Sequence, residues 1–357
     1  MNSIDQNSAG ERVKDTTDAA NVFWSSINSA LTLSCIRTFG QHEAATVEYE
    51  TLRRTHEITL LSLSADAGAN SVLNCVRTHL RLEDGSGIQP EWVEDAAGRH
   101  WLRYRPPYRT GDGPFAPATA PAALGPEIGQ AWFRARHATT ALTVGGPTVI
   151  FVHTHSLTEG DAWDAGYFVD RGEPVAPGNH YERRTSERIP TFDPARLVAQ
   201  LPQTRAPASA IGQLLRDAAS RMIVLCERLG VVAAAAVIEH AFRVVLVERW
   251  QWLPAALGLT PVRTPLAAAQ LYAGTARLAG NEVEVEDHGS YALAHHATDH
   301  LWDSCANVPV AVREAIIRAW SAALPHHDFD LRASLARPLS RSDLRVAIHF
   351  DRGGPGD

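Results

Sequence analysis

The sequence contains two similar helix-and-hairpin segments, one near residue 160 and one near residue 345, and this similarity limits the folds that the chain can adopt. Five positions match at one constant offset (343 − 161 = 182). They are Leu157, Thr158, Asp161, Ala165 and Phe168 in the first segment, and Leu339, Ser340, Asp343, Ala347 and Phe350 in the second. Matches that keep their order along a chain are typical of a duplicated structural unit. We therefore predict an α+β fold made of two diverged copies of a helix plus β-hairpin unit, which form a pseudo-dimer.

The apolar periodicity places this repeat within a longer order of elements. Helical spacing predicts helices over about 17–39, 42–63, 129–142, 208–229, 231–250, 265–279 and 314–324. Alternating patterns predict strands over 148–156, through Phe168, over 282–286, and in a final hairpin. The predicted organisation is a disordered lead-in (1–16), a first α+β unit (17–171), a proline-rich linker (172–207), a second unit (208–352) and a tail (353–357).

Composition excludes several classes of protein. The 357 residues carry a net charge of −7 and no block of positive charge, which argues against a nucleic-acid partner. The four cysteines lie far apart and predict no disulfide framework. No signal peptide is evident, and Glu239, His240 and Arg243 interrupt the most apolar run, so we expect a cytoplasmic protein that contacts no membrane. A single lysine, Lys14, among 33 basic residues indicates a bacterial source with GC-rich DNA, and the sequence is compatible with a homo-oligomer.

Two histidines on the predicted strand 148–156 are the first candidates for catalysis. His153 and His155 alternate with Val149 and Phe151, so an undistorted strand would place both rings on one face. Imidazole is a general base near neutral pH, and Glu159 and Asp161 in the next turn could complete an acid/base group. The structural alternative is that the two histidines are hydrogen-bonded strand residues and that Asp161 caps its own turn.

Arginines and aromatic residues concentrate in two neighbouring stretches and predict a substrate-binding surface. Guanidinium groups pair with carboxylates and stack on aromatic rings, as a planar carboxylate-bearing ligand requires. The alternative is a surface on which arginine stems cover aromatic core residues. The candidate residues are Trp101, Arg103, Tyr104, Arg105, Trp132 and Arg134.

A histidine-rich segment offers a candidate metal site. On a helix, His296 and His300 would lie at i and i+4 on one face, the spacing with which two imidazoles share a zinc ion. The glutamate that often lies between such histidines is absent, and no third ligand is evident. The alternative is that both are ordinary surface histidines.

The tail of each half resembles the family of L-2-amino-thiazoline-4-carboxylic acid hydrolase-like proteins. The resemblance rests on a helix, a strand, a Leu-x-x-x-Asp turn and a return strand ending in Phe, over about 40 residues in each half. In that family a Gly-Asp turn precedes a strand that carries a cysteine. Gly160-Asp161 matches the turn and Ser342-Asp343 matches it in part. Neither half has the cysteine, because Asp164 or Ala165 and Val346 or Ala347 stand where it would fall.

The resemblance implies hydrolysis of a small C–N-containing ring or amide. Together with the histidines, it leads us to expect a small-molecule enzyme of specialised bacterial metabolism that performs hydrolysis or acid/base rearrangement of an amide, a C–N ring or a carboxylate-bearing substrate. No nucleotide-binding or serine-hydrolase motif occurs, so the sequence supports neither a nucleotide cofactor nor serine-hydrolase chemistry, and the cofactor is expected to be none or one that the sequence does not identify. A divalent metal is compatible with His296 and His300. The alternative function is a non-catalytic binding or sensor protein.

Overall fold

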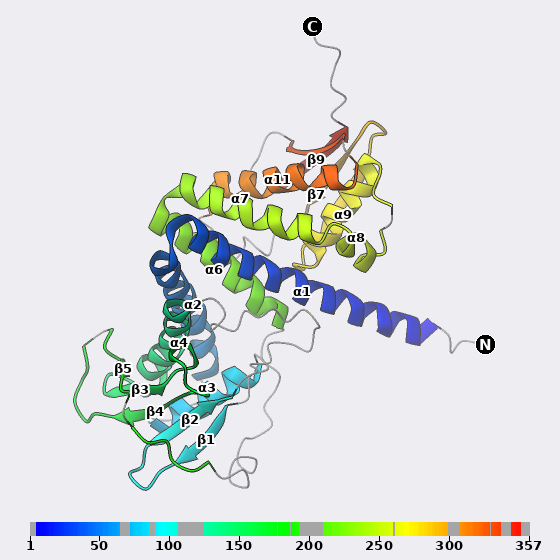
Figure 1. The fold of residues 1–357 in the computed structure, drawn as a ribbon. Helices are drawn as coiled ribbons and strands as arrows, with labels where there is room; N and C mark the ends of the chain where they lie inside the picture. Colours follow the sequence, from blue (N-terminus) through cyan, green and yellow to red (C-terminus); the bar gives the residue numbers. More distant parts are fainter. Residues whose placement is uncertain are drawn as a thin grey trace. The chain divides into compact units, whose positions relative to one another are not determined.

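A computed structural model describes residues 5–64, 72–85, 90–105, 125–176, 178–185, 187–192, 210–259, 261–298, 308–328, 330–336 and 344–350 (Figure 1). Its helices and two sheets divide between two compact units. Unit 1 combines residues 1–38 with 211–357, and unit 2 comprises residues 39–210. The expected α+β class is confirmed. None of the helices within these ranges combines the length and the apolar character that crossing a bilayer requires.

Unit 2 packs three helices on one face of a five-stranded sheet. The helices are α2 (Gln41–Ser64), α3 (Val72–Gly85) and α4 (Pro126–Thr140), and α4 continues into a π-helical turn (Ala141–Gly145). The strands are β1 (Glu91–Glu94), β2 (His100–Tyr104), β3 (Val149–His155), β4 (Asp164–Asp170) and β5 (Tyr181–Arg183), in the order β1-β2-β4-β3-β5. A short 3-10 helix (Leu157–Glu159) joins β3 to β4.

The core of unit 2 lies between the helices and this sheet. Alternate strand residues such as Leu102, Phe151 and Phe168 meet Val76 of α3 and Phe133 of α4 there. The opposite sheet face is covered as well, so that every strand residue in the middle of the sheet is enclosed on both sides. Its cover comes from a segment that the sequence predicted to be a linker.

The predicted linker therefore differs from the structure over residues 172–192. β5 pairs in parallel with β3, and Val175, Ile189 and Phe192 pack against Trp101 and Tyr167 on the outer sheet face. These apolar residues are spaced irregularly among prolines and charges, so they produce no helical or strand period. Residues 193–209 lie outside the described ranges.

Unit 1 combines helices with a four-stranded sheet. Its helices are α1 (Asp5–Phe39), α6 (Ala210–Leu229), α7 (Val231–Glu248), α8 (Trp252–Ala256), α9 (Pro265–Arg277) and α11 (Val310–Ala323). Its strands are β6 (Val283–Asp287), β7 (Tyr291–His296), β8 (Leu331–Leu335) and β9 (Leu344–Phe350), in the order β6-β7-β9-β8. α9 packs on β6 and β7, α11 packs on β8, and a 3-10 turn (Leu324–His326) follows α11.

The first helix departs from its predicted place in two ways. α1 begins at Asp5, within the segment expected to be disordered, and most of it belongs to unit 1 rather than to the first half of the chain. Its buried stripe includes Phe23, Trp24, Ile27 and Leu31. Asn28 donates a hydrogen bond to the carbonyl of Leu214 in α6, which ties α1 to the C-terminal part of the chain.

Candidate functional site

A buried polar cluster lies between the helices and the sheet of unit 2, around the hydroxyl of Tyr104. That hydroxyl is 2.7 Å from Nε2 of His79 and 2.8 Å from Nε2 of His137. Nδ1 of His79 lies 3.2 Å from the hydroxyl of Thr140, which is also 3.1 Å from Nε2 of His56. Burial lowers the pKa of all three histidines well below its ordinary value, so the rings are neutral near pH 7.

A buried carboxyl group borders this cluster. Glu83 follows His79 by one helical turn on α3, and its Oε1 lies 3.3 Å from His79 Nε2 and 2.9 Å from Arg136 Nη2. Burial raises the pKa of Glu83 to about 7, although the guanidinium of Arg136 opposes that rise. Glu83 therefore exchanges its proton near neutral pH if water reaches it.

The cluster extends towards His153 through one aromatic ring. Phe133 stacks on His137 at 4.0 Å between ring centroids and on His153 at 4.3 Å. Nδ1 of His153 bonds the hydroxyl of Tyr181, and its Nε2 lies 3.7 Å from Asp164. These rings are sealed from solvent and most of their nitrogens are hydrogen-bonded, whereas Nε2 of His153 makes no hydrogen bond with the described residues, so the cluster is a buried polar core that is nearly satisfied.

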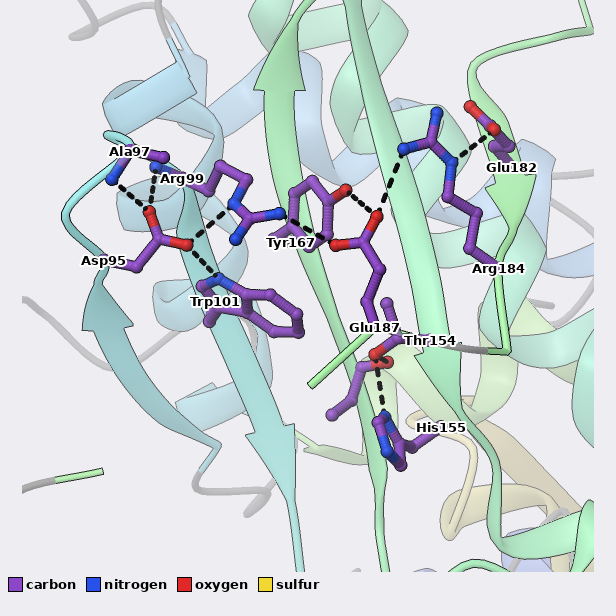
Figure 2. Close-up of polar contacts among 11 residues, drawn as sticks. Asp95, Ala97, Arg99, Trp101, Thr154, His155, Tyr167, Glu182, Arg184 and Glu187 are labelled. Atoms are coloured by element: carbon purple, nitrogen blue, oxygen red, sulfur yellow. Dashed lines mark hydrogen bonds and ion pairs between the residues drawn. The ribbon is translucent and has the colours of Figure 1, made fainter. Parts of the chain in front are cut away.

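The strand histidines are separated by a β-bulge. The pairing of β3 with β4 shifts register between His153 and His155, so the simple alternation expected for the two rings does not hold. His153 faces the helical layer, whereas Nδ1 of His155 lies 3.0 Å from the hydroxyl of the adjacent Thr154 (Figure 2). The two imidazoles therefore do not form one site.

The two predicted acids have local structural partners. Asp161 accepts a hydrogen bond from the backbone of Ser156 at 2.7 Å, which closes the turn between β3 and β4. Glu159 accepts a bond from Gln130 at 2.8 Å and pairs with Arg183. Both carboxylates thus stabilise the turn and the neighbouring strand.

The predicted arginine-aromatic residues of β2 lie on both faces of the sheet, because successive side chains of a strand point to opposite faces. Tyr104 points into the helical layer, whereas Trp101 and Arg103 lie on the opposite sheet face. There Trp101 donates its indole N–H to Asp95 at 2.9 Å. Figure 2 shows this contact within an ion-pair network that continues through Arg99, Glu187 and Arg184 and also holds the hydroxyl of Tyr167.

The other members of that group lie in separate contacts. Arg103 and Arg105 pair with Glu91, and Arg103 also lies over Phe192 at 4.2 Å. The guanidinium carbon of Arg134 lies 5.1 Å from the ring centroid of Tyr49, and that of Arg136 lies 4.5 Å from the ring centroid of Trp132. Since these side chains cover different surfaces, the structure does not assemble them into one binding site.

His296 lies at the end of strand β7, so the helical spacing considered for a metal site was wrong. The histidines and charges of this segment gave no hint of its antiparallel pairing with β6. His300 lies outside the described residues. Among the residues that the structure describes, no three His, Cys, Asp or Glu side chains are arranged to hold a metal ion.

His296 instead contributes to the wall of a cavity in unit 1. The cavity leaves about 70 Å³ for the centres of water-sized groups and is partly open to solvent. Five aromatic residues from α1, α7, α9 and α11 line it, together with aliphatic residues and a few polar ones. The aromatic residues are Phe23, Trp24, Phe242, Tyr272 and Trp320, and the others are Thr275, Ala276, Ala279, Asn281, His296, Arg313, Ile316 and Ile317.

Polar groups of this cavity retain unused hydrogen-bonding capacity. Nε2 of His296 lies 2.9 Å from the hydroxyl of Tyr272, and burial lowers the pKa of the ring to about 4. Nδ1 makes no hydrogen bond of strict geometry with the described residues, but the ring also interacts with the backbone of Thr298, whose hydrogen bond raises the pKa against the effect of burial. The indole N–H of Trp24 is buried without a partner in the described part of the chain. Such groups are costly in a core unless a ligand or water satisfies them.

Sequence patterns missed most of these residues because they come from distant helices. His79 and Glu83, and Phe133 and His137, are each spaced by four residues on buried helix faces. Polar residues at core positions of an amphipathic helix are a usable signal for a buried network. Trp24 gives no such signal, because an indole on an apolar stripe is indistinguishable from ordinary core.

Comparison with known proteins gives no relative. No protein-family model, no curated protein and no solved structure matches the chain significantly.

Proposed function

We propose that this protein binds a small organic molecule in the cavity of unit 1. The observation that carries the proposal is the indole N–H of Trp24, which lies in the wall of an aromatic cavity and finds no partner among the described residues. Ligand sites are concave and largely apolar, with a few polar groups that orient the ligand. The neutral His296 ring and the hydroxyl of Tyr272 would supply that orientation.

The test is a cavity-filling substitution on α9. Ala276 lines the cavity and is half-buried, so Ala276→Phe should occupy the space with little distortion of the fold. Ala267→Phe on the same helix is the matched control, because Ala267 is also half-buried but does not line the cavity. We expect calorimetric binding of 2-naphthamide to wild type and to the control, and loss of binding in Ala276→Phe. Absence of binding by wild type, or equal binding by all three proteins, would overturn the proposal.

A second candidate is hydrolysis or acid/base rearrangement of a small amide or C–N ring at the same cavity. It is favoured by the hydrogen-bonded pair of His296 and Tyr272, because the hydroxyl of Tyr272 can pass its proton to Nε2 of the neutral imidazole while its oxygen takes a proton from an attacking water. It also agrees with the resemblance to the L-2-amino-thiazoline-4-carboxylic acid hydrolase-like family. Release of ammonium and 2-naphthoate from 2-naphthamide, lost in His296→Gln, would support catalysis. Recovery of the amide unchanged would support binding without catalysis.

We also propose that the two halves are diverged copies of one unit. Each contains two helices separated by a glycine, a further helix, a hairpin, another helix and a second hairpin, with the return strands of both hairpins adjacent. A His–Tyr hydrogen bond links corresponding elements, His79 to Tyr104 and Tyr272 to His296. The helical partner stands seven residues after the start of its helix (72 to 79, 265 to 272), and the other partner ends its strand.

A further inference from the structure

The charge of the cavity in unit 1 narrows the class of molecule that it would hold. Arg313 on α11 lines the cavity, and the described lining includes no carboxylate. The half-buried guanidinium places a positive charge in the cavity wall at any pH at which the fold persists, because arginine does not deprotonate there. A cationic ligand would be repelled in this partly desolvated position, and an anionic ligand would be attracted.

The indole of Trp24 points to the same class of ligand. Its buried N–H has no partner among the described residues and can only donate a hydrogen bond, so a ligand group that satisfies it must be an acceptor. The ring of His296 bonds the hydroxyl of Tyr272 and the backbone of Thr298. A buried N–H donor beside a guanidinium complements the oxygens of a carboxylate.

The walls define the rest of the ligand. Tyr272 and Trp320 meet edge to face at 5.4 Å, and Trp24 and Phe242 meet in the same way at 6.5 Å. Aromatic walls of this kind accept a flat unsaturated ring by stacking or edge contacts. From the charge, the indole donor and the walls together, we infer that the cavity binds an aromatic carboxylate, its ring held among the aromatic residues and its carboxylate near Arg313 and Trp24.

This inference rests on the proposed binding function, and a charge series separates the two. The probes are 2-naphthoate, 2-naphthamide and 2-naphthylmethylamine, which share a ring system but are anionic, neutral and cationic at pH 7. Titration calorimetry of wild type should give the tightest binding for the naphthoate, about tenfold tighter than for the amide, as expected for one charge-assisted interaction. The amine should bind most weakly.

Two arginine variants identify the source of the preference. Arg313→Gln should reduce the preference for naphthoate over the amide to about twofold or less, because the amide side chain keeps donors without the charge. Arg318→Gln on the same helix is the matched control, since Arg318 pairs with Glu239 and does not line the cavity. It should retain the wild-type preference.

Each outcome has a distinct meaning. An amide that binds as tightly as the naphthoate, with both blocked by Ala276→Phe, would overturn the carboxylate class and leave the binding function standing. A naphthoate preference that survives Arg313→Gln would also overturn it. Failure of all three probes to bind, or binding that Ala276→Phe does not change, would remove the inference and the proposed function together.

Discussion

The hydrogen bonds around Tyr104 accept a single direction of donation when all three imidazoles are neutral. The hydroxyl of Thr140 lies 2.9 Å from the carbonyl of Arg136 and 3.2 Å from Nδ1 of His79, so it donates its one proton to these acceptors and accepts a hydrogen bond from His56. His79 donates to Tyr104, and Tyr104 donates to His137. His137 then donates from Nδ1 to the carbonyl of Phe133 at 2.8 Å. This chain fixes the ring tautomers, which geometry alone leaves open.

We therefore predict the Nε2–H tautomer for His56 and His79 and the Nδ1–H tautomer for His137. Nitrogen chemical shifts of the imidazoles, measured by NMR near pH 7, report the protonated nitrogen directly. A protonated His79 ring, or the Nε2–H tautomer at His137, would show that the chain of donation is reversed or carries an additional proton.

Removing the hydroxyl of Tyr104 should destabilise unit 2. Tyr104→Phe keeps the ring but leaves His79 and His137 facing each other without their bridging group. The expected loss in the free energy of unfolding is about 1–3 kcal/mol, measured by urea denaturation. Tyr49→Phe is the control, because the hydroxyl of Tyr49 makes no hydrogen bond with the described residues. Equal losses in the free energy of unfolding of both variants would show that the hydrogen bonds of Tyr104 do not stabilise the fold.

Glu83 should make stability depend on pH in a defined direction. Its pKa in the folded state, about 7, lies above the ordinary value of 4.5. The stabilisation from the protonated acid is therefore complete below about pH 4.5 and is lost as pH rises through 7. The free energy of unfolding of Glu83→Gln, minus that of wild type, should increase by about 2–3 kcal/mol across this interval.

The buried histidines contribute the opposite dependence, which cancels in that difference. Their lowered pKa values mean that their stabilisation is present above about pH 6.5 and is lost as pH falls. Glu57→Gln, at an exposed site on α2, provides the reference carboxylate. A difference between Glu83→Gln and wild type that stays constant from pH 4.5 to 7.5 would contradict the burial of an ionisable carboxyl.

Among the helices and strands, the sequence pattern predicted those in which buried apolar residues recur at a regular spacing. The helices α2, α6, α7 and α9 and the strands β3, β4 and β6 lie close to their predicted ranges, because each presents one continuous apolar face or stripe. β5 was missed because three paired residues among prolines carry no period. The strand at His296 was missed because its pairing with β6 and β9 is set by distant parts of the chain.

The same limit applies to the candidate site. Tyr104, His153 and His296 could be singled out as polar residues in apolar surroundings. Their partners Tyr181 and Tyr272, and the cavity beside His296, depend on contacts between helices and strands that are far apart in sequence. The kinds of residue in the site could be predicted from sequence. That Trp101 and Tyr104 lie on opposite faces of the sheet could be known only from the pairing of β2 with β4.

Gly230 should be essential to the break between α6 and α7. Its dihedral angles, φ 77° and ψ 156°, lie in a region that only glycine adopts readily. A Cβ atom there would meet no neighbour within 4 Å, so the cost of Gly230→Ala is conformational. Thermal denaturation should show a loss of about 1–3 kcal/mol. Ala236→Gly, at an exposed position inside α7, should cost about 1 kcal/mol, and a smaller loss for Gly230→Ala would contradict the strained geometry.

In the whole molecule, helices and strands follow a similar order in the two units, but the residues enclosed between the helices and the sheet differ. Between helices and sheet, unit 2 has neutral imidazoles, Phe133 and a buried acid around Tyr104. Unit 1 has a single histidine bonded to Tyr272 and a cavity with aromatic walls. If the halves are copies, one has kept an open interior suited to a ligand, and the other has filled its interior with side chains that stabilise the fold.

The most direct measurement of the central claim is a crystal structure of the full-length protein grown with 2-naphthoate. We predict electron density for the naphthyl ring among Trp24, Tyr272 and Trp320, with the carboxylate directed towards Arg313, and no such density in Ala276→Phe. An empty cavity in wild type at saturating ligand, or a naphthoate bound elsewhere, would contradict the claim that unit 1 carries the binding site.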